Sequence, residues 1–161
     1  MTSEVSGSEA ALLDPAVWGT PRRSRDTLSR SERRATIRKP QSRSPGELAV
    51  PALTTPGIDR REAFADDRIW VGTIRTEAKT WSDWHVHPGH DTYGFVTEGI
   101  ARVEFDADGN GIETGPGGFV LIPAGAPHRE GNPGEVPNAG VIFRVGEGPV
   151  LEPLDGPPPS T

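Results

Sequence analysis

The sequence predicts an all-β fold built around one domain. Apolar residues between positions 58 and 150 fall into short runs rich in β-branched and aromatic side chains, and none of these runs has the period of an amphipathic helix. Many of the chain's 20 glycines and 17 prolines separate these runs, where they indicate turns. With 161 residues, the chain is long enough for one ordinary domain and too short for two.

The expected strands are short and are bounded by turn signals. In order, they are Arg68–Thr76, Trp81–His87, Tyr93–Thr97, Ile100–Phe105, Ile112–Thr114, Phe119–Ile122, His128–Glu130 and Gly140–Val145. Between the fourth and fifth of these, the sequence DADGNG ends in Asn110-Gly111, a pair suited to the positive φ values of a tight hairpin. This many short strands in about 105 residues indicates a β sandwich or a small barrel.

Composition divides the chain into three parts. We expect residues 1–48 to be a disordered Arg/Ser-rich leader, residues 49–152 to be the folded domain, and residues 153–161 to be a flexible Pro-rich tail. Residues 1–50 hold nine Lys/Arg and six Asp/Glu, net +3, whereas residues 51–161 hold eight and seventeen, net −9. A nucleic-acid-binding arm is the alternative interpretation of the leader. Its lack of interleaved aromatic residues and the acidic domain behind it speak against nucleic acid as a partner.

Residue types and segments that the sequence lacks limit the class of protein to which it can belong. There is no cysteine, which excludes disulfides, thiolate metal sites and a thiol nucleophile, and which fits a reducing cytoplasm. The first twenty residues show no apolar signal-peptide segment, and no apolar run approaches the ~20 residues that a membrane span needs. The sequence therefore predicts a cytoplasmic protein without a membrane partner.

Three of the four histidines lie within six residues, in the segment WHVHPGHDTYGF, residues 84–95. His85 and His87 are two apart on an expected strand, so both imidazoles point to one face and can chelate one divalent ion. His128 is the only histidine outside this cluster and is the candidate for the third ligand. The alternative is that these are ordinary surface or core histidines that bind no metal.

The segment GGFVLIPAGAPHREGN, residues 117–132, strengthens the metal interpretation because it resembles the second motif of the cupin superfamily. That motif is G, five residues, PxG, two residues, H, three residues, N. Gly117, Pro123, Gly125, His128 and Asn132 match every position.

The first cupin motif, G, five residues, HxH, three or four residues, E, six residues, G, is matched in part. His85, His87 and Gly99 fit it, whereas Lys79 occupies the position of the motif's first glycine. The resemblance covers roughly residues 56–150. It implies a jelly-roll β-barrel of two antiparallel sheets, one divalent metal ion per subunit at the barrel centre, and a homodimer.

Thr92 stands where most cupins have a glutamate ligand. We expect a site of His85, His87 and His128, with Asp91 or His90 as a possible fourth ligand. Strand alternation puts His90 and Thr92 on the inward face, so Asp91 needs a distorted chain to reach the metal. A hydroxyl is a poor ligand for a divalent ion, so Thr92 is expected to hydrogen-bond a metal-bound water or to cap the strand.

Other residues around the histidines have two interpretations each. Trp81, Tyr93, Thr92 and Arg144 are candidates for a substrate pocket. Aromatic residues of a small barrel are more often part of its core, whereas Arg144 is equally suited to the surface or to binding a substrate carboxylate. Glu130 shares a face with His128, so it is a candidate general base near the metal or a solvated residue at a hairpin end.

The candidate function is that of a metal-dependent cupin enzyme acting on a small anionic or chelating organic molecule. Three neutral histidines leave open positions suited to iron(II), a chelating substrate and dioxygen, so dioxygenase-type chemistry is favoured. Zinc, manganese or nickel would instead give a redox-silent isomerase, lyase or decarboxylase. The third alternative is a non-catalytic module that binds a small molecule.

Overall fold

The computed structural model describes residues 39–52 and 54–160, which contain ten strands and one short 3-10 helix. These elements are η3 (Pro45–Glu47), β1 (Ile58–Ala65), β2 (Ile69–Thr76), β3 (His85–Val86), β4 (His90–Glu98), β5 (Ala101–Glu104), β6 (Gly111–Thr114), β7 (Phe119–Ile122), β8 (Arg129–Gly131), β9 (Asn138–Gly146) and β10 (Glu152–Pro153). The expected all-β fold is confirmed. Within the part of the chain described, no helix is long and apolar enough to cross a membrane.

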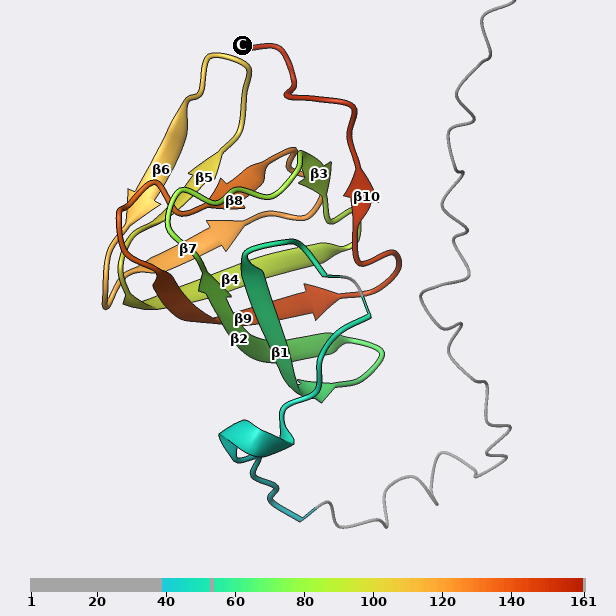
Figure 1. The fold of residues 1–161 in the computed structure, drawn as a ribbon. Helices are drawn as coiled ribbons and strands as arrows, with labels where there is room; N and C mark the ends of the chain where they lie inside the picture. Colours follow the sequence, from blue (N-terminus) through green and yellow to red (C-terminus); the bar gives the residue numbers. More distant parts are fainter. Residues whose placement is uncertain (1–38, 53, 161) are drawn as a thin grey trace, which may run out of the picture. The chain divides into compact units, whose positions relative to one another are not determined.

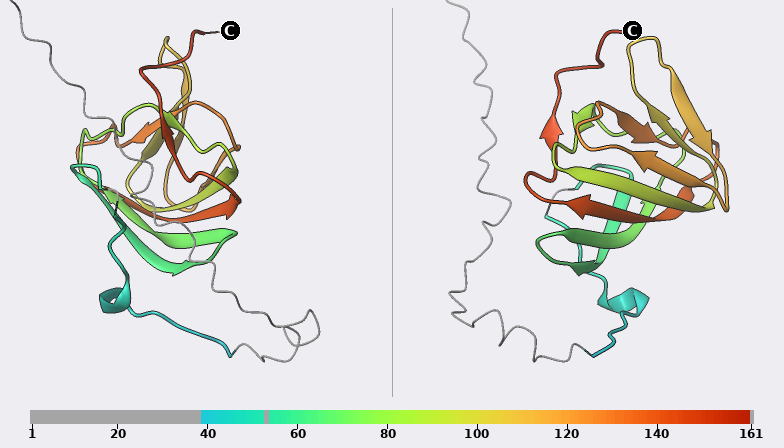
Figure 2. Two further views of the ribbon diagram at one scale, coloured as in Figure 1. Left: turned by 90° about the vertical axis from the view of Figure 1, so that its right-hand side faces the viewer. Right: turned by 180° about the vertical axis from the view of Figure 1, so that it is seen from behind.

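The strands form two antiparallel sheets that face each other, with a small ribbon at one end (Figure 1). The larger sheet has the order β1-β2-β9-β4-β7, the smaller one has the order β6-β5-β8, and the ribbon pairs β10 with β3. Figure 2 shows the same layers from the side and from behind. The buried apolar side chains come from both sheets: Ile58, Val96, Val103, Ile122 and Ile142. The core therefore lies between the sheets, as in a jelly roll.

Period-2 alternation decides which side chains of β4 face this interior. Thr92 and Val96 are buried, whereas Tyr93, one residue along from Thr92, is 42% exposed on the outer side. The neighbouring strands keep this register, because Thr92 lies opposite Ile122 on β7 and opposite Arg144 on β9.

The strands differ from expectation at two places. β1 was not expected, and it forms the outer edge of the larger sheet by pairing with all of β2. Its inward positions include Arg60 and Glu62, so its sequence lacks the apolar alternation that marks a half-buried strand. The strand expected at Trp81–His87 is regular only at His85–Val86, and Trp81 makes an isolated bridge to Gly131.

The two ends of the domain make backbone hydrogen bonds. Ala49 pairs with Glu62 on β1. Near the other end, the N–H of Leu154 donates to the carbonyl of Trp84, and the N–H of Ala107 donates to that of Pro158. Residues expected in a flexible tail are thus hydrogen-bonded up to position 158. Most of the expected leader, residues 1–38, lies outside the described residues, and the domain limits stay a proposal.

Candidate metal centre

Backbone pairing brings the two histidine motifs together. The N–H of each of His85 and His128 donates to the carbonyl of the other, at 2.9 and 3.0 Å, which makes them directly opposite partners. The N–H of Gly125 donates to the carbonyl of His87 at 3.0 Å, and this hydrogen bond holds the turn before His128 next to His87. The three imidazoles consequently lie with ring centroids 4.3 to 5.2 Å apart.

The rings are oriented so that their Nε2 atoms remain available. The Nδ1–H of His85 donates to the carbonyl of Asp83, and that of His128 donates to Ala126, both at 2.8 Å. The Nδ1–H of His87 donates in the same way to Val150. The Nε2 atoms of His85 and His128 are buried and have no hydrogen-bond partner. Such orphaned acceptors, with carbonyls fixing the other nitrogen, are what a divalent ion requires.

The three histidines are the group within the described residues whose donor atoms, one from each, all lie within 4.8 Å of one another. Each of these residues is at most 4% exposed. Burial, followed by the positive charge of Arg144, lowers the pKa of His87 to about 3. Burial also lowers the pKa of His128, against the opposing effect of Glu130. His87 and His128 are therefore neutral at neutral pH and keep a lone pair for a metal.

Backbone conformation explains most of the second motif. Gly117 and Gly125 have φ of +85° and +74°, a region that side chains with a Cβ rarely adopt. Asn132 is fully buried, and its amide nitrogen donates to the carbonyls of Thr76 and Val136 while its oxygen accepts from the N–H of Gly134. Asn132 thus fixes the turn that follows β8.

Lys79 shows why glycine is usual at the start of the first motif. Among the described residues it is the one non-glycine with positive φ, at +56°. The lysine thus keeps the backbone shape that the glycine would adopt, at some cost in conformational strain. Its ammonium group is bound outside the barrel by the carbonyl of Pro133 and the carboxylate of Glu135.

The expected position of the fourth ligand is filled by a neutral residue. Thr92 is 6% exposed, and its hydroxyl is buried without a hydrogen-bond partner. Asp91 is not in the group formed by the three histidines, and its carboxylate accepts from the N–H of Ala124 at 2.8 Å. His90 is buried and its Nδ1 has no partner, but the ring is not in the group formed by the other three histidines.

A carboxylate reaches the histidines from another strand. Glu130 on β8 places Oε2 at 3.4 Å from Nε2 of His85 and at 3.8 Å from Nε2 of His128. Arg60 on β1 donates to its other oxygen at 2.8 Å, and Ser82 donates to Oε2 at 3.1 Å. Burial raises the pKa of Glu130, but the neighbouring His85 and Arg60 side chains outweigh this effect and hold the pKa well below its usual range. Sequence reasoning missed Arg60 and Ser82.

Two of the histidines open into a cavity between the sheets. The polar side chains that line it include His87, His128, Thr92, Glu130 and Arg144. The remaining lining is largely apolar and comes from β2, β4, β5, β7 and β9. The cavity has a volume of about 80 Å³, and one water molecule needs roughly 10–15 Å³. There is room for a small organic molecule.

Two candidates for the substrate pocket lie outside it. Tyr93 is on the outer face of β4, because strand alternation turns it away from Thr92. Trp81 is not among the residues that line the cavity, and its ring packs 4.8 Å from the guanidinium of Arg129. Arg129 also pairs with Glu104 at 2.6 Å, which places both partners on the outer side of β8 and β5.

Comparison with known proteins agrees with this architecture. Residues 72–143 match the family model for the cupin domain. Among solved structures, the polyketide cyclase RemF from Streptomyces resistomycificus is 18% identical with a TM-score of 0.60, covering 72% of this chain and 86% of its own. An uncharacterized double-stranded β-helix protein from Klebsiella pneumoniae is 17% identical with a TM-score of 0.59, covering 73% and 99%.

KdgF from a Halomonas species is 18% identical with a TM-score of 0.56, covering 68% of this chain and 96% of its own. Identities this low show a shared fold alone. Among curated proteins the chain has no match. The family match runs from within β2 to within β9 and includes all three histidines of the candidate metal centre. This chain therefore contains a small cupin domain.

Proposed function

We propose that the protein is a metal-dependent cupin enzyme that acts on a small organic anion at His85, His87 and His128. The supporting observation is the set of three buried imidazoles, each held by a backbone carbonyl at Nδ1. Surface or core histidines without a ligand would not leave two buried Nε2 atoms without partners. One divalent ion per subunit is the cofactor that these donors fit.

The favoured chemistry is of the non-haem iron dioxygenase type. Iron(II) bound at this centre would supply open positions for dioxygen and a chelating substrate. The chain contributes three histidine donors and no carboxylate at the glutamate position, because Thr92 stands there and the Asp91 carboxylate accepts from the N–H of Ala124. The apolar lining of the cavity would exclude water from the reacting molecule.

A redox-silent isomerase, lyase or decarboxylase is the second candidate, and Glu130 is the observation that favours it. Its carboxylate lies beside two of the histidines and is held in place by Arg60 and Ser82. A fixed carboxylate beside the metal-binding histidines can take a proton from a bound substrate or return one to it. Zinc, manganese or nickel would supply this chemistry as a Lewis acid, without a change of oxidation state.

Metal analysis combined with oxygen uptake tests the proposal. Protein purified without chelator is expected to carry about one divalent ion per subunit, and the His87→Ala variant is expected to lose most of it. Iron together with oxygen consumption on addition of small carboxylic acids would support the dioxygenase. Zinc, nickel or manganese without oxygen consumption would support the isomerase or lyase. Equal and negligible metal content in both proteins would leave only a non-catalytic binding module.

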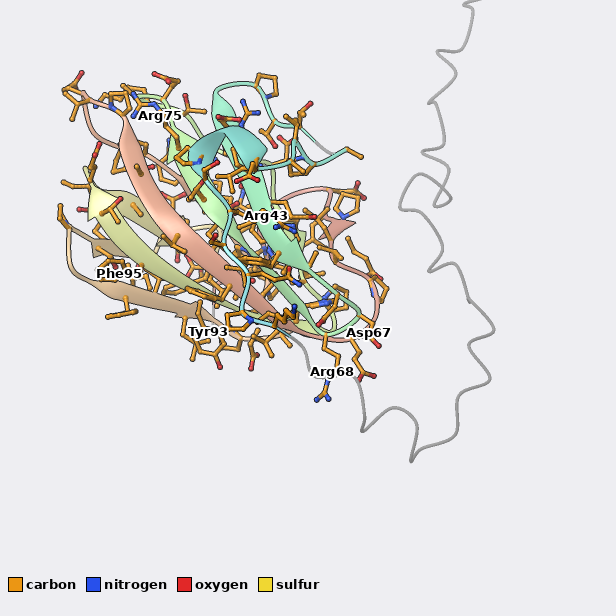
Figure 3. All side chains as sticks on the ribbon, turned by 90° about the horizontal axis from the view of Figure 1, so that it is seen from below. Arg43, Asp67, Arg68, Arg75, Tyr93 and Phe95 are labelled. Atoms are coloured by element: carbon orange, nitrogen blue, oxygen red, sulfur yellow. The ribbon has the colours of Figure 1, made fainter. Side chains whose placement is uncertain are left out.

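We also propose that the homodimer implied by the resemblance forms through the outer face of the larger sheet. Five large apolar side chains are 39% to 78% exposed there: Tyr93, Phe119, Leu121, Phe143 and Val145. Tyr93 lies directly between Leu121 on β7 and Phe143 on β9, so the surface is continuous across three strands. Figure 3 looks onto this outer apolar face, with Tyr93 and Phe95 labelled on β4. Such continuous patches mark interaction sites.

A further inference from the structure

Arg144 is a buried cation without a partner of its own. Its side chain lies on β9, between Trp70 on β2 and Thr92 on β4, and the residue is 9% exposed. Its Nε is buried with no hydrogen-bond partner, and no carboxylate of the described residues lies within 4.0 Å of the guanidinium. The guanidinium carbon lies 5.5 Å from the centroid of the Trp70 ring. Buried guanidinium groups are ordinarily paired, because leaving one unpaired is costly.

The nearest acidic group cannot neutralise this cation fully, because it is already used. Glu130 is the acidic residue whose charge acts on Arg144, and that carboxylate is hydrogen-bonded to Arg60 and Ser82. Inside the barrel, the negative charge of Glu130 thus acts on two guanidinium groups, those of Arg60 and Arg144. Burial lowers the pKa of Arg144 to about 10, so the group remains charged at neutral pH. A divalent ion at the histidines would add further positive charge, and the cavity then favours an anion.

Thr92 supplies a second unused donor at the same place. It is the cross-strand partner of Arg144, both residues line the cavity, and its hydroxyl is buried without a partner. An acidic residue at position 92 would have paired with Arg144. With threonine there, the guanidinium N–H groups and the hydroxyl remain available to a third molecule.

We propose that Arg144 and Thr92 form a binding site for the carboxylate group of a small organic acid, the substrate of this enzyme. The planar guanidinium matches the two oxygens of a carboxylate, and the Thr92 hydroxyl donates to one of them. The apolar cavity lining holds the hydrocarbon part of the acid next to the histidines. The term substrate rests on the proposed function, whereas the carboxylate site depends only on these residues.

Binding of isobutyrate and of isobutyramide to metal-free protein tests this site. The two probes have the same shape, and only the first is an anion. Titration calorimetry in a buffer without carboxylate or phosphate gives both affinities, and the labelled Nε–Hε resonance of Arg144 reports contact in the wild-type protein. Isobutyrate is expected to bind about tenfold or more tighter than the amide and to shift that resonance.

Three variants identify the donors. Arg144→Gln is expected to lower isobutyrate affinity about tenfold or more and to leave amide binding unchanged, and Thr92→Val is expected to lower it about two- to tenfold. Arg75→Gln is the matched control, because it removes an exposed arginine of β2 (Figure 3) and should change neither affinity. Equal binding of acid and amide to the wild type, or an unmoved Arg144 resonance on saturation, would overturn the proposal even if Arg144→Gln failed to fold.

Metal binding separates this test from that of the proposed function. Isobutyrate bound through Arg144 in a protein that takes up no metal would overturn the enzyme proposal and leave the carboxylate site standing. Normal metal uptake together with no preference for the acid would overturn the carboxylate site alone.

Discussion

At the scale of single residues, three polar side chains in the barrel interior are buried with incomplete or unusual partners. Arg144 lies there without an ion-pair partner, Glu130 bonds to Arg60 beside His85, and Thr92 leaves its hydroxyl without a hydrogen bond. None of these arrangements adds to stability, because each leaves polar or charged groups imperfectly matched in a buried place. Residues that lower stability in this way are typical of binding sites.

The first prediction concerns the stability cost of Arg144. In metal-free protein without a bound anion, Arg144→Met is expected to raise the free energy of unfolding by about 1–3 kcal/mol, because an unpaired buried charge is replaced by an apolar side chain of similar length. Urea denaturation followed by tryptophan fluorescence measures the change. Arg75→Met, at an exposed arginine, serves as the control and is expected to change stability little. A lower stability for Arg144→Met would mean that the guanidinium has structural partners.

The second prediction concerns the positive φ of Lys79. The glycine variant relieves the left-handed strain and the alanine variant does not, while both lose the contacts of the ammonium group to Pro133 and Glu135. Lys79→Gly is therefore expected to be more stable than Lys79→Ala by about 1 kcal/mol. Thermal unfolding of the two variants side by side gives this difference. An alanine variant as stable as the glycine variant would contradict the strain.

At the scale of elements, the sequence predicts the strands that carry the metal centre and misses the strand that supports it. His85, His87 and His128 follow from HxH alternation and from a complete second motif, both of which are local patterns. β1 carries Arg60 on its inward side, and this residue bonds to Glu130, seventy positions away. A charged residue facing inward breaks the alternation by which strands are recognised, and a partner that distant leaves no local signal.

The turn after β8 provides the third prediction. Asn132→Ala removes three hydrogen bonds and leaves backbone groups of Thr76, Val136 and Gly134 without that partner. The expected loss of stability is about 2–4 kcal/mol. Chemical denaturation measures it, and Asn110→Ala in the exposed hairpin is a matched asparagine control with a smaller expected loss. Similar losses for the two variants would contradict the role given to Asn132.

At the scale of the whole molecule, the fold could be predicted because the cupin motifs specify where the strands and turns lie. The position of the exposed apolar surface could not be predicted from the sequence, because it depends on which strands become neighbours in the sheet. Phe119 and Phe95 are far apart in the sequence, yet they are cross-strand partners with ring centroids 4.8 Å apart. Only the sheet order β9-β4-β7 makes one continuous outer apolar face from the residues of three strands.

The fourth prediction tests this face as the dimer contact. The wild-type protein is expected to sediment at twice the chain mass of 17.2 kDa. Phe119→Ser combined with Leu121→Ser is expected to give the monomer, because the apolar surface that drives association is lost. Ile112→Ser is the control, since it removes an exposed apolar residue from the other sheet and should leave the dimer intact. A monomeric wild-type protein, or a double variant that stays dimeric, would contradict this contact.

The central claim is that three histidines, and no residue at the missing glutamate position, bind the metal. It is tested most directly by titrating one metal, zinc, into the wild-type protein and into the His87→Ala and Asp91→Ala variants under one buffer condition. His87→Ala removes a direct donor and is expected to abolish most of the affinity. Asp91→Ala removes a carboxylate that holds the N–H of Ala124, and its expected loss does not exceed the about 10–100-fold typical of supporting groups. Equal losses in the two variants would contradict the account, and so would full zinc affinity in His87→Ala.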